Sequence, residues 1–193
     1  MTDRPIIFSA PMVQALLAGR KTQTRRLLKK PTAIDALAVF GPKFLTLPGN
    51  VDLVGYAPGD RLYVREAMCW VSSWGWRYRA DNDDLTEKRE AGEVGRWRPS
   101  IHMPRWASRL TLTVTEVRVQ RLQDISAADA VAEGALQSWT GSDPESDTRT
   151  ALNEFEALWN SLHGPGAWAT NPWVVAVSFT VQHGNIDAGG DHG

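Results

Sequence analysis

Cysteine is almost absent from this chain, and long apolar runs are absent too. Cys69 is the single cysteine in 193 residues, so no disulfide can form within the chain. Apolar runs such as Trp173–Val177 are far shorter than the ~20 residues that span a bilayer. The first residues lack an apolar stretch followed by a small-residue cleavage site. We therefore expect a cytoplasmic protein with no membrane partner.

The sequence also lacks the common catalytic and cofactor-binding motifs. It contains no phosphate-binding G-x-x-x-x-G-K-[ST], no G-x-G-x-x-G, no G-x-S-x-G and no H-E-x-x-H. The four histidines lie far apart in sequence, so we expect neither a metal site nor a cofactor. Cys69 lies among apolar neighbours, which favours a small buried side chain over a nucleophile.

The composition fits one soluble globular domain, but the charge is unevenly distributed. Hydrophobic residues make up 42% and charged residues 22%, and the net charge is -1. The segment 20–30 is basic and holds no acid, whereas 81–93 is rich in Asp and Glu. Two interpretations stay open for these segments: ordinary solvated faces, or a basic surface that binds RNA.

Hydrophobic patterning predicts an α+β fold. We expect strands at 6–8, 61–67, 109–122 and 173–182, and an extended segment at 21–26. A change of apolar parity near Thr115 and Glu116 indicates a bulge in the long strand. Helices are expected after Ser9, at 33–39, at 126–134 with a capping box at Ser126, and at 152–162. Residues 97–106 are expected to be mainly loop.

The domain organisation follows from the same pattern. We expect a single domain over 1–182, with insertions at about 31–58 and 71–100, and a disordered tail over 183–193. The second insertion is rich in tryptophan. Trp74, Trp76, Trp97 and Trp106 either cover the domain or stack on a nucleobase.

The stretch L-A-G-R-K-T-Q-T-R-R, residues 17–26, carries the most specific chemistry. Lys21 and Thr24 lie three residues apart, so both can point into one pocket if the chain turns between them. A lysine of lowered pKa could then take the proton of the Thr24 hydroxyl and make it a nucleophile for an amide or ester. Burial and the cations Arg20, Arg25 and Arg26 would lower the Lys21 pKa.

Several segments together resemble the ASCH family, whose members are PUA-like β-barrels. The first is L-A-G-R-K-T-x-T, followed by G-D-R-L-Y-V-R-E at 59–66, D-A-V-A-E-G at 129–134 and the strand at 173–179. Their order, with the loop P-S-I-H-M-P-R-W at 99–106, is similar to ASCH proteins of phages and prophages. The resemblance spans most of residues 5–182 and implies a mixed β-barrel with flanking helices.

The resemblance also implies an activity. Some small bacterial ASCH proteins are amidohydrolases that remove the acyl group from N4-acetylcytidine and related nucleosides with a Lys, a Thr and a Glu. By motif these correspond to Lys21 as base, Thr24 as nucleophile and Glu133, which would orient the lysine or pass protons to the leaving amine. The candidate substrate-binding residues are Arg20, Arg26, Arg65, Glu66, His102 and Trp106. Arg65 and Glu66 alternatively pair with each other.

Other ASCH proteins resemble RNA-binding proteins or ribonucleases, so an RNA partner is the alternative to a nucleoside substrate. Binding through the basic segment 20–30 would weaken steeply with salt. A phage structural protein without catalysis is a third possibility.

Overall fold

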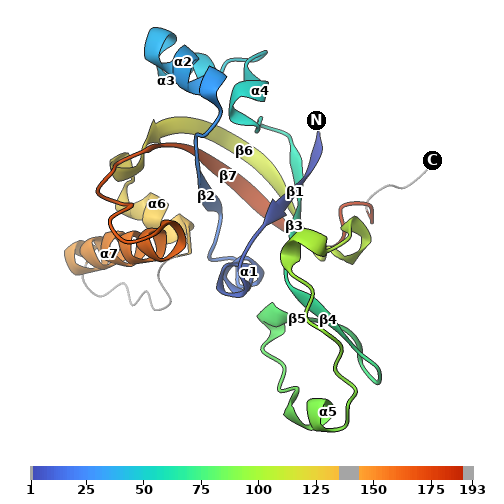
Figure 1. The fold of residues 1–193 in the computed structure, drawn as a ribbon. Coiled ribbons are helices and arrows are strands. Elements are labelled where there is room, and N and C mark those ends of the chain that lie inside the picture. The colour runs from blue at the N-terminus through green and yellow to red at the C-terminus, as the bar shows by residue number, and fades with distance from the viewer. Residues whose placement is uncertain (1, 135–143, 189–193) are drawn as a thin grey trace. The chain divides into compact units, whose positions relative to one another are not determined.

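The structure is a computed structural model that describes residues 2–134 and 144–188 of the chain. It is α+β, as the sequence predicts. A mixed sheet of five strands has the order β1-β3-β6-β7-β2, and β4 and β5 form a separate hairpin (Figure 1). The strand bounds are Asp3–Ile7 (β1), Gln23–Leu27 (β2), Arg61–Arg65 (β3), Met68–Val71 (β4), Gly75–Tyr78 (β5), Leu110–Arg121 (β6) and Trp173–His183 (β7).

The chain divides into two compact units, where the sequence suggested one domain over 1–182. The first comprises residues 1–19, 60–113 and 181–193, and the second comprises 20–59 and 114–180. The division falls inside β6 and inside β7, so both strands contribute residues to each unit.

In the first unit, β1 runs parallel to β3, and β3 runs antiparallel to the start of β6. Leu62 and Val64 of β3 are buried while their neighbours are half-buried, which matches the predicted alternation. Helix α1, Ala10–Leu17, begins after Ser9 with Pro11 in its first turn. Gly19 follows it at φ +68°, a conformation that favours glycine.

The first unit also contains the hairpin of β4 and β5. Isolated bridges Met68 to Arg98 and Val71 to Val94 place segment 94–98 along β4 as a third extended stretch. In sequence, the 3-10 helix η1, Arg79–Asp81, and helix α5, Thr86–Glu90, lie between β5 and segment 94–98. Cys69 is fully buried against Val71 and Leu85, which confirms the interpretation of a small core side chain, and burial raises the pKa of its thiol.

The expected loop at 97–106 is confirmed, and the expected tail begins later than residue 183. The loop holds only the short 3-10 helices η2, Ser100–His102, and η3, Arg105–Ala107. His183 ends β7, and the next residues form a turn in which Ile186 is only 3% exposed. The amide of Asn185 donates to the carbonyls of Arg105, Trp106 and Ser108. The tail prediction is therefore wrong for 183–188, because these side chains have partners far away in sequence; 189–193 lie outside the described residues.

In the second unit, β2 pairs antiparallel with β7 in the register Thr24 to Val177. Helices α6, Ala127–Ala132, and α7, Pro144–His163, are packed together (Figure 1). Phe155 and Trp159 of α7 join Leu122, Ile125 and Val174 in one buried cluster. Ser126 is the N-cap of α6, since its hydroxyl accepts from the Asp129 N–H at 3.1 Å, which is one of the two hydrogen bonds of the expected capping box. The 3-10 helix η4, Leu122–Asp124, precedes α6.

The segment 31–58 contains three helices, whereas one was expected at 33–39. They are α2, Pro31–Phe40, α3, Pro42–Leu45, and α4, Val51–Val54. Gly41 at φ +77° ends α2, and Pro42 is the first residue of α3. The many Pro and Gly residues of this segment favoured a loop, but here they separate two helices.

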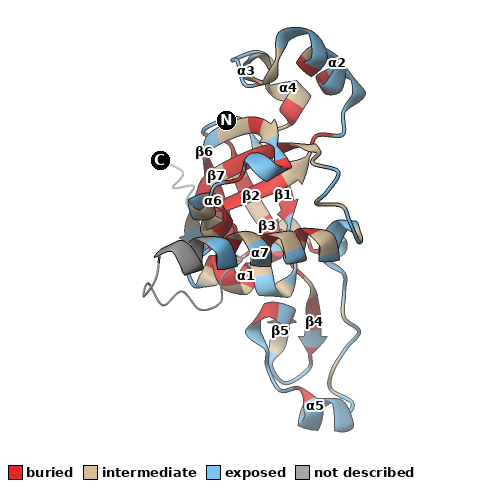
Figure 2. Cartoon of the chain, turned by 90° about the vertical axis from the view of Figure 1, so that its left-hand side faces the viewer, coloured by how far each residue is buried: buried red, intermediate tan, exposed pale blue. Residues whose placement is uncertain are grey.

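The long strand β6 has the predicted break. Thr115 and Glu116 are both exposed, so the alternation of buried and exposed residues is interrupted there. Figure 2 shows the buried residues concentrated on the sheet strands, while α5 is mostly exposed. Among the described residues, every helix is too short or too polar to traverse a lipid bilayer.

Candidate active site

The candidate site lies in the second unit, where the start of β2 meets the end of α6. Lys21 lies two residues before β2, and Glu133 is the C-terminal cap of α6. The Thr22 N–H donates to the Ala132 carbonyl at 2.8 Å, and the Phe179 N–H donates to the Thr22 carbonyl at 2.9 Å. These backbone bonds tie the link before β2 to α6 on one side and to β7 on the other.

Lys21 and Glu133 form a buried ion pair. The Lys21 Nζ lies 2.9 Å from Glu133 Oε2 and 2.8 Å from the Glu133 backbone carbonyl. A third acceptor, the carbonyl of Gln23, also lies at 2.8 Å. Lys21 is 1% exposed and Glu133 is 4% exposed. Three acceptors match the three donors of an ammonium, so the arrangement fits the charged form of Lys21.

Burial lowers the pKa of Lys21 below its ordinary value, because the ammonium loses its hydration. The Glu133 carboxylate opposes this shift, while the nearby cations Arg26 and Arg25 add to it. The direction is the one that a lysine base requires.

Arg25 is a second buried cation on the same carboxylate. Its Nη1 lies 3.1 Å from Glu133 Oε1 and also donates to the side-chain carbonyl of Gln23. Its Nη2 lies 2.8 Å from Asp129 Oδ2. Each oxygen of the Glu133 carboxylate therefore binds a different cation, Lys21 on one and Arg25 on the other. The double contact fixes the orientation of the carboxylate.

Asp129 extends this network toward β6. Its carboxylate accepts from Arg118 at 3.1 Å and from the Gln23 amide at 3.2 Å. Partial burial raises the pKa of Asp129, but the hydrogen bond from Arg118 and the charge of Arg25 outweigh it, so the pKa falls below its ordinary value. The result is a chain of alternating charges from Lys21 through Glu133, Arg25 and Asp129 to Arg118.

Thr24 is buried at 4% exposure and sits within β2, one residue from Gln23 and Arg25. Successive side chains of a strand face opposite sides, so Thr24 lies on the other face of β2 from the Arg25 guanidinium. The structure thus brings Lys21 and Glu133 together, and Thr24 follows Lys21 by three residues, inside β2.

The basic segment 20–30 is only partly a surface. Lys21 and Arg25 are buried and bound to carboxylates, while Arg20, Lys29 and Lys30 are exposed. Arg26 is half-buried and pairs through its backbone with Val175, on the same face of β2 as Thr24.

The other four candidate residues belong to the first unit. Arg65 donates to the carbonyls of Met103 and Ile101, and Glu66 binds Arg109 through both oxygens, at 2.8 and 3.1 Å. The alternative in which Arg65 and Glu66 pair is therefore wrong, since adjacent residues of an extended segment point to opposite sides. His102 and Trp106 are exposed and lie in the loop 97–106.

Sequence reasoning missed Arg25, Asp129 and Arg118 as members of the network. The alternation within β2 is the signal that could have found Arg25, because it shares a face with Gln23. The sequence patterns that include Asp129, the helix start at Ser126 and the motif D-A-V-A-E-G, give it no role in an ion pair. Among the described residues, no three metal-ligating side chains of the His, Cys, Asp or Glu type come together.

Comparison with known proteins adds little. No family model and no curated protein matches the chain. Among solved structures, the chain is similar to protein EF3133 from Enterococcus faecalis V583, described as DUF984, with a TM-score of 0.39 and 14% identity. The similarity covers 100% of this chain and 84% of that one.

Proposed function

We propose that the chain is an amidohydrolase that removes the acyl group from N4-acylated cytosine nucleosides or related nucleobase amides. The supporting observation is the Lys21–Glu133 pair, in which a lysine 1% exposed is bound to a carboxylate 4% exposed. Burying two charges costs free energy that a hydrophobic pair avoids, so such pairs are common where function needs them. The ASCH resemblance, with its PUA-like barrel, belongs to the same proposal.

The proposed chemistry starts with a proton moving along the 2.9 Å contact from Lys21 to Glu133. This leaves a neutral amine and a carboxylic acid, and the burial that lowers the Lys21 pKa assists the loss of its proton. The amine then takes the proton of the Thr24 hydroxyl while Thr24 Oγ attacks the acyl carbonyl. Glu133 returns its proton to the N4 nitrogen as the C–N bond breaks, which releases the cytosine amine and leaves an acyl-threonine. Water hydrolyses that ester and restores Thr24.

The mechanism requires Thr24 Oγ to approach Lys21 Nζ when substrate binds. Arg25 holds the second oxygen of Glu133 at 3.1 Å, so the carboxyl can exchange a proton with Lys21 without rotating. Arg25 is thus a positioning residue in this scheme. Arg20, Arg26, Arg65, Glu66, His102 and Trp106 remain candidates for substrate contacts.

The test is cytidine release from N4-acetylcytidine by the wild type and by Lys21→Met, Thr24→Val and Glu133→Gln. We expect each variant to lose at least ~100-fold in kcat/KM, the usual contribution of a positioned proton-transfer group. Ser178→Ala is the control, because Ser178 accepts from the Gln23 amide in the same network without a proposed chemical role. The proposal is wrong if the wild type releases no cytidine, or if Thr24→Val retains full activity.

The competing interpretation is a purely structural ion pair that attaches α6 to β2. It predicts that the three variants lose stability without any substrate effect. An acyl-enzyme trapped at Thr24 and seen as a mass increase in the intact protein would separate the two interpretations.

A further inference from the structure

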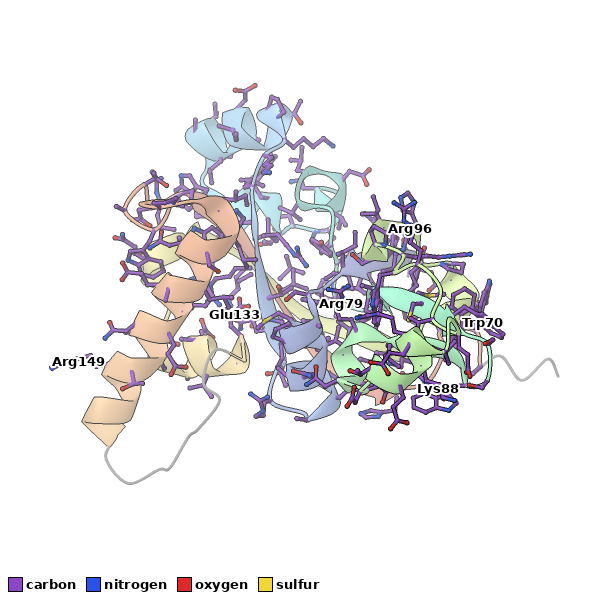
Figure 3. All side chains as sticks on the ribbon, turned by 60° about the horizontal axis from the view of Figure 1, so that its bottom comes forward. Trp70, Arg79, Lys88, Arg96, Glu133 and Arg149 are labelled. Atoms are coloured by element: carbon purple, nitrogen blue, oxygen red, sulfur yellow. The ribbon has the colours of Figure 1, made fainter. Side chains whose placement is uncertain are left out.

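The segment 68–106, which we call the arm, exposes large aromatic side chains. Trp70 is 46% exposed, Trp74 42% and Trp106 61%. Figure 3 shows Trp70 projecting from the arm. A contiguous patch of exposed tryptophans on a soluble protein marks an interaction surface, because a bound partner would remove this large apolar area from water.

The Trp76 ring connects two of these rings, those of Trp70 and Trp106. The Trp70 and Trp76 ring centroids lie 5.3 Å apart in an edge-to-face arrangement, and Trp76 and Trp106 lie 6.0 Å apart. The Arg98 guanidinium lies over the Trp76 ring, 5.1 Å from its centroid. Trp70 and Trp106 thus flank a ring that already carries a cation, and both remain exposed.

A concavity of about 620 Å³ opens beside Trp70. Its walls include Trp97, Arg96, Arg98 and His102, and its lining contains no acidic residue. Arg96 is exposed, and its side chain has no hydrogen bond, ion pair or ring contact with any described residue. The site therefore combines an exposed aromatic face with a guanidinium that has no partner within the described chain.

Backbone contacts hold the walls in place. The Gly95 N–H donates to the Trp70 carbonyl at 2.7 Å, and the Arg98 N–H donates to the Met68 carbonyl at 2.7 Å. A Cβ at residue 95 would lie 3.0 Å from the Trp70 carbonyl oxygen, so glycine allows this close approach. Arg96, between the two bonds, is thereby presented beside Trp70.

A second concavity, of about 480 Å³, shares Trp97 with the first. Arg77, Arg79 and Arg89 line it, and its one acid, Asp83, already pairs with Arg77. The Arg79 guanidinium lies over Trp97, 4.6 Å from its centroid. The two concavities therefore have Trp97 as a common wall, and arginines line both of them.

We propose that the arm binds single-stranded nucleic acid, with an unpaired base stacked on Trp70 and flanking phosphates on Arg96 and Arg98. The chemistry points to this ligand because aromatic faces accept any base and arginines bind phosphate oxygens with two donors. The arginines disfavour a cationic ligand, and the presence of two arginine-lined concavities on the arm favours a polymer over a mononucleotide. The three residues that carry this proposal, Trp70, Arg96 and Arg98, have no role in the proposed amidohydrolase mechanism.

The experiment measures fluorescence anisotropy of labelled dT12 and rU12 oligonucleotides with the full chain at 50 and 300 mM salt. We expect binding at low salt that weakens at high salt, because phosphate contacts release counterions. Trp70→Ala should weaken binding about 5- to 150-fold, the effect of losing one stacked base, and Trp70→Phe should restore most of it. Arg96→Ala should weaken binding and lower the salt slope by about one.

The matched control is Arg149→Ala, which removes one exposed arginine from α7 (Figure 3). It should leave binding unchanged. An equal loss of affinity in Arg149→Ala and Arg96→Ala would mean that only the net charge of the protein matters, and it would overturn the proposed site. Absence of binding at 50 mM salt would overturn the proposal as well. Displacement of the oligonucleotide by uridine monophosphate at equal nucleotide concentration would show that the site binds a mononucleotide, and it would overturn the proposal of a polymeric ligand. Loss of cytidine release in the amidohydrolase assay has no bearing on any of these outcomes.

Discussion

The Lys21 ammonium and the Glu133 carboxylate lie 2.9 Å apart, and both side chains are at most 5% exposed. They are separated by 112 residues in sequence and come from an extended link and a helix end. The same carboxylate also binds Arg25, so one anion serves two buried cations. Removing Glu133 would leave two buried cations without this anion, so the network is most sensitive to substitution at Glu133.

Glu133→Ala should strongly destabilise the fold. Lys21 and Arg25 would lose their shared carboxylate while remaining buried, and breaking a buried pair in this way costs about 3–5 kcal/mol. Urea unfolding at pH 7 measures the change. The control is Glu116→Ala, whose carboxylate pairs with Arg118 at a position where it is 58% exposed, so its midpoint should hardly move. Equal midpoints for the two variants would contradict a stabilising role for the buried pair.

Stability should rise with pH in the alkaline range because of Lys21. Its pKa is lowered in the folded protein, so between that value and the unfolded value of about 10.4 the unfolded chain binds more protons. The penalty for burying the ammonium is therefore full below the folded pKa and relieved as pH rises through the window. Unfolding free energies of the wild type and Lys21→Met, compared from pH 7 to 10, measure this. Parallel curves would mean that the Lys21 pKa is not lowered.

Glu66 should give the opposite slope at mildly acidic pH. Burial raises its pKa despite the hydrogen bond and charge of Arg109, so above the unfolded value of about 4.3 the folded protein binds more protons. Stability associated with Glu66 therefore falls as pH rises through this window. Glu66→Gln should remove the slope, and Arg109→Ala should extend it to higher pH. Urea midpoints from pH 4 to 7 test both variants, and an unchanged slope in Glu66→Gln would exclude the assignment.

Asn185→Ala should destabilise the first unit. Its amide donates to the carbonyls of Arg105 and Ser108 at 2.8 Å, and losing these bonds should cost about 1–3 kcal/mol, although the Arg105 carbonyl keeps the N–H of Ser108 as a donor. Asn153→Ala, an exposed position on α7, is the control and should change stability little. Thermal unfolding of the two variants compares them. An Asn185→Ala protein as stable as the control would indicate that the turn after β7 contributes nothing.

Local patterns predicted the elements well where a periodicity or a cap was present. The strand over 173–182, the helix over 152–162 and the helix start at Ser126 all have signals that depend on neighbouring residues, and the structure has each of them. The segment 31–58 lacked such a signal, because short helices of four residues do not complete a hydrophobic period. The prediction of a disordered tail after His183 was wrong for a different reason, because the partners that stabilise this turn lie about 80 residues away in sequence.

By itself the sequence determined the α+β class, the burial of Cys69 and the candidacy of Lys21, because each depends on residue type and short-range order. Glu133 became a candidate through the resemblance to the ASCH family. Only the tertiary structure decided which charges meet. It gave Glu133 a second cation in Arg25, joined Glu66 to Arg109 instead of Arg65, and set segment 94–98 against β4 so that Arg96 stands beside Trp70. Charges attract over distances that the folded chain alone sets, so sequence spacing carries no record of these pairs.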